Sequence, residues 1–215
     1  HVPDLRPEWA VIPEAKWRAL ADDEIRDASG EVIHPGSEAV GKVAFAIHVA
    51  MDRSWAAIAV AGQRSDGLLH VELIDYRMGT QWVPMRAKQL QDRWDPCDWV
   101  VDAGGPAGSL IADLTAKGLD VTTPSARDVA AAYGQFVDAV MPEEGEPTLR
   151  YITHPALDVA VAGAATRSLT TAKAWDAVTA TTESSPLIAV TNAAWGFATK
   201  GHIVEEVREP LVAFR

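Results

Sequence analysis

Hydrophobic residues cluster in short runs from Val43 onward, and polar or glycine-containing breaks separate these runs. The first runs are VAFAIHVAM, SWAAIAVAG and LLHVELIDY, which are joined by AspArg and by GlnArgSerAspGly. Apolar or alternating runs with tight polar breaks between them are typical of consecutive antiparallel strands. The pattern therefore predicts a three-stranded antiparallel meander at the start of a domain over residues 43–200.

The next segments change between helical and strand patterns. WVPMRAKQLQDRW has apolar residues at near-helical spacing, and CDWVVDAGG is a short apolar run that stops at Asp102 and two glycines. Residues 106–117 predict a helix closed by Gly118, and LDVTT predicts another strand. Strands joined through a helix favour parallel pairing, so we expect an α/β fold with a mixed sheet flanked by helices.

The last third of the domain supplies helices that can cover this sheet. RDVAAAYGQFVDAV predicts a helix and LRYIT a short strand, while HPALDVAVAGAATRSL predicts a small-residue helix suited to close packing. A strand over AWDAV, a Thr/Ser loop and a helix over SPLIAVTNAAWGFAT are expected to complete the core.

The two ends of the chain differ from this domain. Residues 1–42 mix proline, tryptophan and charge, with one helix candidate at Pro13, and are expected to form an arm or linker. Residues 201–215 are expected to be a tail. The chain begins at His1 rather than Met, which indicates a fragment or processed form. Neither a membrane span nor a signal peptide is expected, because no apolar run is long enough and no basic start precedes one.

Composition limits the classes of function. The chain of 215 residues is 48% hydrophobic, enough for one substantial core, and its formal net charge is −11. That charge argues against tight binding of nucleic acid by electrostatics alone, unless metal ions or neighbouring domains supply positive charge. Cys97 is the only cysteine, which excludes an intrachain disulfide and fits a reducing compartment. No GxxxxGK[ST] phosphate loop is present, so no nucleotide-driven motor is expected in this chain.

Four residues are candidates for chemistry. Asp102 closes an apolar run before GlyGly, where it is either a ligand at a strand end or a turn residue. Glu183 precedes the last helix, where an acid also favours the helix dipole. His48 lies inside an apolar strand and is either a hydrogen-bonded core residue or a ligand, and Asp52 just beyond it is either a turn residue or an auxiliary ligand.

The motifs resemble one known family. AFAIHVAMDRSWAAIAVAG, VVDAGGPAGSLIADL, HPALDVAVAGAATR and SSPLIAVTNAAWG occur in the order of the nuclease portion of terminase large subunits from tailed phages or prophages of actinobacteria. The resemblance covers roughly residues 40–200. The opening VIPEAKW is also similar to the segment that joins the ATPase domain of that family to its nuclease.

The resemblance implies an RNase H-like fold and two-metal cleavage of phosphodiester bonds with two Mg²⁺ or Mn²⁺ ions. The acids of the family map onto His48, Asp102 and Glu183, with Asp52 as a possible additional ligand; aspartate is usual at the His48 position. A neutral imidazole is a poor Mg²⁺ ligand and removes a negative charge. We therefore expect an endonuclease that is impaired or inactive with Mg²⁺.

The resemblance also implies partners. These are double-stranded DNA, a terminase ATPase domain absent from this chain, the portal protein and the small terminase subunit, in the host cytoplasm and without a membrane partner. Little base preference is expected, because backbone recognition carries no sequence information directly. The basic candidates for DNA contact, each of which could equally be a solvated surface residue, are Arg53, Arg127, Arg167 and Lys200.

Three other functions fit parts of the pattern. A Holliday-junction resolvase or integrase-like nuclease would use the same fold and metal chemistry on a different DNA shape. A non-catalytic RNase H-like module for assembly or DNA clamping would fit His48 and the acidic charge. An actin-like nucleotide-binding domain would need glycine-rich phosphate turns, which DAGGP matches only weakly.

Overall fold

The central element of the computed structural model, which describes residues 8–169 and 172–201, is a mixed six-stranded sheet. Its strand order is β7-β6-β3-β4-β5-β8. The meander of β3, β4 and β5 is antiparallel, while β6 is parallel to β3, β7 to β6 and β8 to β5. The predicted mixed sheet is thus confirmed. The strands are β3 (Val43–Val49), β4 (Trp55–Gln63), β5 (Leu69–Met78), β6 (Asp98–Val101), β7 (Val121–Thr122) and β8 (Leu149–Tyr151).

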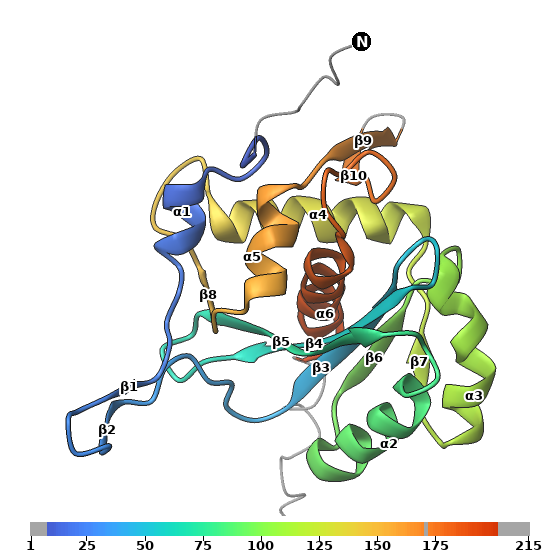
Figure 1. Ribbon diagram of the computed structural model, residues 1–215, viewed down its shortest axis with the longest axis horizontal. Helices are drawn as coiled ribbons and strands as arrows, with labels where there is room; N and C mark the ends of the chain where they lie inside the picture. The colour runs from blue at the N-terminus through green and yellow to red at the C-terminus, as the bar shows by residue number, and fades with distance from the viewer. Residues whose placement is uncertain (1–7, 170–171, 202–215) are drawn as a thin grey trace, which may run out of the picture.

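Helices cover both faces of the sheet (Figure 1). One apolar cluster joins the sheet to residues of α4, α5 and α6, and a second joins the opposite face to α2, the 3-10 turn η1 and α3. The helical elements are α2 (Val83–Trp94), η1 (Pro106–Leu110), α3 (Ile111–Ala116), α4 (Ala126–Val140), α5 (Pro155–Ala162) and α6 (Ser185–Lys200).

The alternation of side chains along β3 decides which helix each residue meets. Val43, Phe45 and Ile47 belong to the cluster with α2 and α3, whereas Ala44 and Ala46 belong to the cluster with α6. Successive side chains of a strand point to opposite faces, so His48 lies on the same face as the alanines. The polar residue of β3, His48, therefore lies on the face of the sheet that packs against α6.

Small residues allow α6 to approach the sheet closely. Gly196 of α6 lies so close to β6 that a Cβ built there would be 2.5 Å from Cγ2 of Val100 and 3.6 Å from Cβ of Ala44. Such distances exclude a larger side chain without movement of the strand or the helix. The alanines of β3 and β4 and this glycine therefore set the spacing between helix and sheet.

The segment before the domain packs onto it. In α1 (Glu14–Arg18), Trp17 is fully buried, stacks on Tyr151 with 4.2 Å between ring centroids and donates from Nε1 to Oδ1 of Asp158 at 2.8 Å. A short hairpin of β1 (Ile25–Arg26) and β2 (Val32–His34) follows and projects from the body (Figure 1). At least the α1 part of residues 1–42 thus shares the core of the domain.

Two predictions for the last third were wrong. The predicted helix over 154–169 ends at Ala162, and β9 (Thr166–Leu169) follows. The predicted strand over AWDAV ends earlier than expected, because β10 (Ala172–Trp175) contains only its first two residues and pairs with β9 in a separate two-stranded sheet. Gly163 is the C-cap of α5, and close packing requires glycine there, since a Cβ built on it would be only 2.1 Å from Oγ1 of Thr182.

The described part of the chain contains no helix long and apolar enough to cross a membrane. Most of the predicted tail, residues 202–215, lies outside the described residues.

We expect replacement of Trp17 by alanine to lower the free energy of unfolding by roughly 3–5 kcal/mol, the usual cost of truncating a buried aromatic side chain. The matched control is Trp94→Ala, because Trp94 is 50% exposed whereas Trp17 is 0% exposed. Urea unfolding should show less than about 1 kcal/mol loss for the control. Equal losses in the two variants would contradict the assignment of α1 to the core.

Candidate functional site

Two of the predicted site residues lie side by side at one end of the sheet. β3 and β6 are parallel, and Ile47 is paired with Val101. The next residue of each strand, His48 and Asp102, therefore falls at the same level. Val100 packs on the α6 side and Val101 on the α2 side, so alternation places Asp102 on the α6 side, as it does His48.

The start of α6 brings a third predicted residue to this end. Oε1 of Glu183 accepts hydrogen bonds from the backbone N–H of Ser185 at 2.8 Å and from its hydroxyl at 2.6 Å. Pro186 stands in the first turn, where its missing N–H carries no penalty. The loop before α6 thus folds back on the helix, and Glu183 is tied to Ser185.

Ser185 links this loop to β3. Its hydroxyl lies 2.9 Å from Nδ1 of His48, so Glu183, Ser185 and His48 form one continuous hydrogen-bonded chain. Ser185 is fully buried and His48 is 7% exposed. The chain therefore joins the helix to the strand beneath the surface.

His48 and Asp102 line the same cleft, of about 290 Å³. Residues from the β9–β10 hairpin and the loop after it, from the loop after β6, from α4 and from α6 complete its walls. They include Gly104, Gly105, Pro106, Val129, Arg167, Trp175, Asp176, Thr191 and Asn192.

Burial determines the charge of the imidazole. Desolvation lowers the pKa of His48 to about 4, although the negative charges of Glu183 and Asp102 oppose this shift. Glu183 also acts on Tyr76, whose pKa is raised to about 12, mainly by burial and secondarily by that carboxylate. His48 is accordingly a neutral imidazole at neutral pH.

Asp102 begins a tight turn rather than continuing the strand. Its Oδ1 accepts from the backbone N–H of Gly104 at 2.8 Å, and its carbonyl oxygen accepts from Gly105 at 3.3 Å. Among the hydrogen bonds of the described residues, none occupies Oδ2 of Asp102 or Nε2 of His48. Both atoms therefore keep an electron pair that a ligand in the cleft could use.

The other candidates are dispersed. Arg167 lines the cleft, but Asp52 lies in an exposed turn and accepts from the backbone N–H and hydroxyl of Ser54. The guanidinium of Arg53 is bonded to the Pro106 carbonyl and to the hydroxyls of Ser109 and Thr80.

The last two basic candidates stand away from the cleft. Arg127 is exposed on the first turn of α4 and does not line the cleft. Lys200 binds Asp98 and Thr122 at the opposite end of β6 and α6.

Two residues of the site were not predicted from the sequence. Asp176 lines the cleft, and its pKa is lowered first by the hydroxyl of Thr179 and then by backbone N–H groups. The turn-forming pattern Asp-x-x-Thr after a strand was the available signal. Ser185 was visible only as a helix-start residue, and its contact with His48 depends on the tertiary packing.

These side chains do not fit a pair of hard cations. Within residues 8–169 and 172–201, no three histidine, cysteine or acidic side chains are grouped closely enough to hold a metal ion. One oxygen of Glu183 is already occupied by Ser185, and His48 supplies nitrogen where Mg²⁺ prefers oxygen. What remains is one imidazole nitrogen and one carboxylate oxygen, on two residues that line the same cleft.

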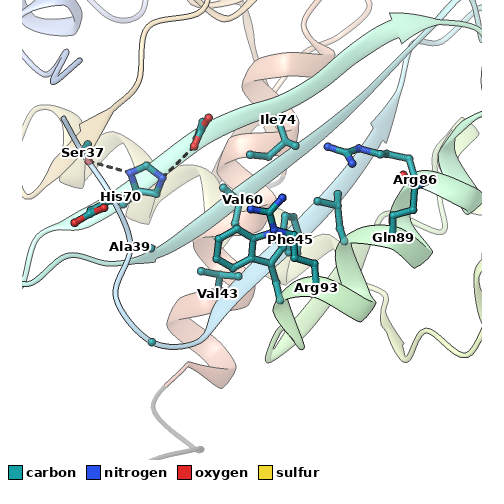
Figure 2. A pocket seen from close by; sticks show the side chains of 15 residues that line it. Ser37, Ala39, Val43, Phe45, Val60, His70, Ile74, Arg86, Gln89 and Arg93 are labelled. Atoms are coloured by element: carbon teal, nitrogen blue, oxygen red, sulfur yellow. Dashed lines mark hydrogen bonds and ion pairs between the residues drawn. The ribbon is translucent and has the colours of Figure 1, made fainter. Parts of the chain in front are cut away.

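A larger cavity, of about 560 Å³, lies on the other face of the sheet beside α2 (Figure 2). Its floor is apolar, and His70 stands at one side between Ser37, at 2.9 Å, and Glu72, at 3.6 Å. None of the predicted site residues lines this cavity. Both ring nitrogens of His70 have partners, so this histidine differs from His48.

The fold is that of the nuclease domains of phage large terminases. No protein-family model and no curated protein sequence matches the chain. Solved structures do: the chain is similar to the large terminase of bacteriophage HK97, with a TM-score of 0.64 and 13% identity over 84% of this chain. That match covers 42% of the HK97 chain, so the present chain corresponds to less than half of it.

Two isolated nuclease domains also match. The large terminase nuclease from thermophilic phage G20c with bound magnesium has a TM-score of 0.53 and 11% identity, covering 81% of this chain and 91% of that one. A mutant nuclease domain of the large terminase subunit of bacterial virus Sf6 with manganese has a TM-score of 0.50 and 14% identity, covering 72% and 88%. At these identities the likeness establishes the fold, and it confirms the predicted resemblance at that level.

The burial of neutral His48 predicts a pH dependence of stability. Its folded pKa of about 4 lies below the usual histidine pKa of 6.5, so between these values the unfolded chain binds a proton that the folded chain does not. The contribution of neutral His48 to the free energy of unfolding is therefore fully present above pH 6.5 and is lost as the pH falls from 6.5 toward 4. From pH 7.5 to 4.5 we expect roughly 2–3 kcal/mol more loss in the parent than in His48→Asn.

Urea unfolding in a chelating buffer measures this difference. Comparison with the asparagine variant removes the contributions of all other titrating groups, because both proteins share them. An identical loss of stability in the two proteins would show that His48 is not held neutral in the folded state.

Proposed function

We propose that this chain is the DNA endonuclease module of a terminase-type packaging enzyme, and that His48 impairs its cleavage with Mg²⁺. The observation that carries the proposal is the placement of His48 and Asp102 on the α6 side at the ends of adjacent parallel strands, in a terminase nuclease fold. Ligands commonly bind beyond the carboxyl ends of such strands.

The substrate class follows from the fold and the charge. The chain has a formal net charge of −11, so its own surface is a weak attractor for phosphate. Double-stranded DNA would be brought to the cleft by partner domains and by a cation. Arg167 is the one basic candidate that lines the cleft, and it is our proposed contact to the DNA backbone.

Divalent cations in a complete site of this kind activate water and stabilise the leaving oxygen. In this chain Asp102 would supply a carboxylate oxygen, while His48 supplies a neutral nitrogen and one negative charge fewer than an aspartate. Two-cation cleavage with Mg²⁺ is therefore proposed for an arrangement with aspartate at position 48, and a weakened form of it for this chain.

The remaining partners rest on the likeness to larger terminase chains. We propose that a separate ATPase domain, the portal protein and the small terminase subunit act with this module in the host cytoplasm. The segment around Trp17, which packs into the core, would then be the end of the linker that transmits force or movement from the ATPase domain.

A non-catalytic clamping or assembly module is the second candidate. The specific observation in its favour is that the described acidic and histidine side chains form no three-membered metal cluster. A Holliday-junction resolvase would differ from both by preferring four-way junctions to linear duplex.

Replacement of His48 by aspartate should raise plasmid cleavage with Mg²⁺ by at least about tenfold, because it restores an oxygen ligand and a negative charge. Adding Asp102→Asn to this variant should abolish the gain. Supercoiled plasmid, linear duplex and four-way junction should be compared with Mg²⁺ and with Mn²⁺.

The matched control is Asp92→Asn, which changes an exposed α2 carboxylate paired with Lys88 and should leave cleavage unchanged. Absence of cleavage by every form would favour the non-catalytic module, whereas preferential cutting of junctions would favour the resolvase.

A further inference from the structure

Two arginines on the α2 side of the sheet share one buried carboxylate. Arg77 of β5 and Arg86 of α2 both form ion pairs with Asp75, and Nε of Arg86 lies 2.6 Å from its Oδ2. Asp75 is 8% exposed, and a buried carboxylate needs a positive partner. One guanidinium balances its charge, so the second leaves the cluster with a net positive charge. The side chain of Arg77 is 53% exposed, and this charge is therefore open to solvent.

The guanidinium of Arg77 is oriented by two neighbours. Its Cζ lies 4.9 Å from the centroid of the Trp82 ring, which is a cation–π contact. Nε1 of Trp82 donates to the carbonyl of Gly79 at 3.0 Å, and this bond holds the ring in place. Trp82 and Asp75 together thus position Arg77. A planar guanidinium with N–H donors to spare matches the paired oxygens of a phosphate group.

The pair of arginines lies at the same end of the sheet as the cleft. Arg77 is paired with Ala56 of β4, and Ala56 is paired with Val49, the residue after His48. Neighbouring strands are about 4.8 Å apart, so about 10 Å separate Arg77 from the end of β3. Along a duplex, successive phosphates of one strand advance by about 3.4 Å. DNA bound at the cleft would therefore present phosphates to Arg77 roughly three nucleotides from the cut.

Arg53 connects the cleft to this part of the surface. Its guanidinium donates to the carbonyl of Pro106, which lines the cleft, and to the hydroxyl of Thr80, between β5 and α2. None of the ion pairs among the described residues includes Arg53, whose partners are uncharged. Two aspartates, Asp52 and Asp75, stand against the three arginines. This edge of the sheet therefore keeps a net positive charge, although the formal net charge of the chain is −11.

We propose that Arg77 and Arg86, held by Asp75 and Trp82, bind the phosphate backbone of duplex DNA a few nucleotides from the cleft. The choice of DNA as the partner rests on the proposed function. The contact recognises the charge and shape of the backbone and carries no base information directly. It also supplies, at one edge of an acidic chain, the positive charge that neutralisation of phosphates requires.

Binding of a labelled linear duplex, measured by fluorescence anisotropy in a chelating buffer, tests the contact without cleavage. At about 50 mM salt, Arg77→Gln should weaken binding on the order of tenfold, because one phosphate contact is lost. The slope of log affinity against log salt concentration should fall by about 1. Arg77→Lys keeps the charge and should retain most of the slope. Both variants leave Arg86 as the partner of Asp75, which preserves the fold.

The matched control is Arg93→Gln. Arg93 stacks on Trp94, with Cζ 5.1 Å from the ring centroid. It resembles Arg77 in this contact, but it lies in the last turn of α2 rather than beside the first. The control removes the same charge and should leave duplex affinity nearly unchanged, because α2 is about 18 Å long and salt screens exposed charges over such a distance.

Absence of duplex binding by the parent, unchanged binding by Arg77→Gln, or an equal loss in Arg93→Gln would each overturn the inference. If His48→Asp cleaves plasmid while Arg77→Gln binds duplex as the parent does, the proposed function stands and only this inference falls. If no form cleaves and Arg77→Gln still loses binding, the contact stands and the chain is a DNA-binding module without cleavage.

Discussion

The close packing of α6 against an alanine-lined sheet face is the constraint on which the rest of the structure depends. Ala44 and Ala46 on β3 and the missing side chain of Gly196 allow the helix to lie near the strands. The first turn of α6 therefore reaches the ends of β3 and β6, where Ser185 contacts His48. A bulky residue at these small positions would separate the helix from the strand and break the chain of hydrogen bonds.

The imidazole on β3 changes the chemistry that this scaffold can support. Burial lowers the pKa of His48 and keeps the imidazole neutral, although the charges of two carboxylates act in the opposite direction. A neutral nitrogen attracts hard cations less than a carboxylate oxygen would, and Asp102 is the one carboxylate of the predicted set that lines the cleft. The same neutrality suits a cation that prefers nitrogen. In the proposed function, charge at this single position separates a two-cation nuclease from one with weakened metal binding.

Much of the fold could be predicted from the sequence because its signals are local. The apolar runs of β3 to β6 and the periodicity of α2, α4 and α6 gave elements that the structure confirms. The end of α5 was missed because Gly163 stands among alanines that continue the helical pattern. A Cβ at Gly163 would be 2.1 Å from Oγ1 of Thr182, so the close approach of that residue requires glycine there. Alanine-rich segments carry weak information about where a helix stops.

The site was predictable only in part for a related reason. His48 and Asp102 stood out as polar residues at or near the ends of apolar runs, and the structure brings them to one cleft. The role of Asp176 depends on the β9–β10 hairpin, and that of Ser185 on a contact between residues far apart in the chain. Arg53 and Lys200 could not be recognised as structural from sequence, because their partners come from distant elements.

The most direct test of the account counts the Mn²⁺ ions bound by this chain and by His48→Asp, using electron paramagnetic resonance of free Mn²⁺ during titration. The account predicts at most one ion for the parent chain and two for the aspartate variant, with the second lost on Asp102→Asn. Two ions bound by the parent chain, or no added ion in His48→Asp, would contradict the claim that this one residue sets the metal content of the site.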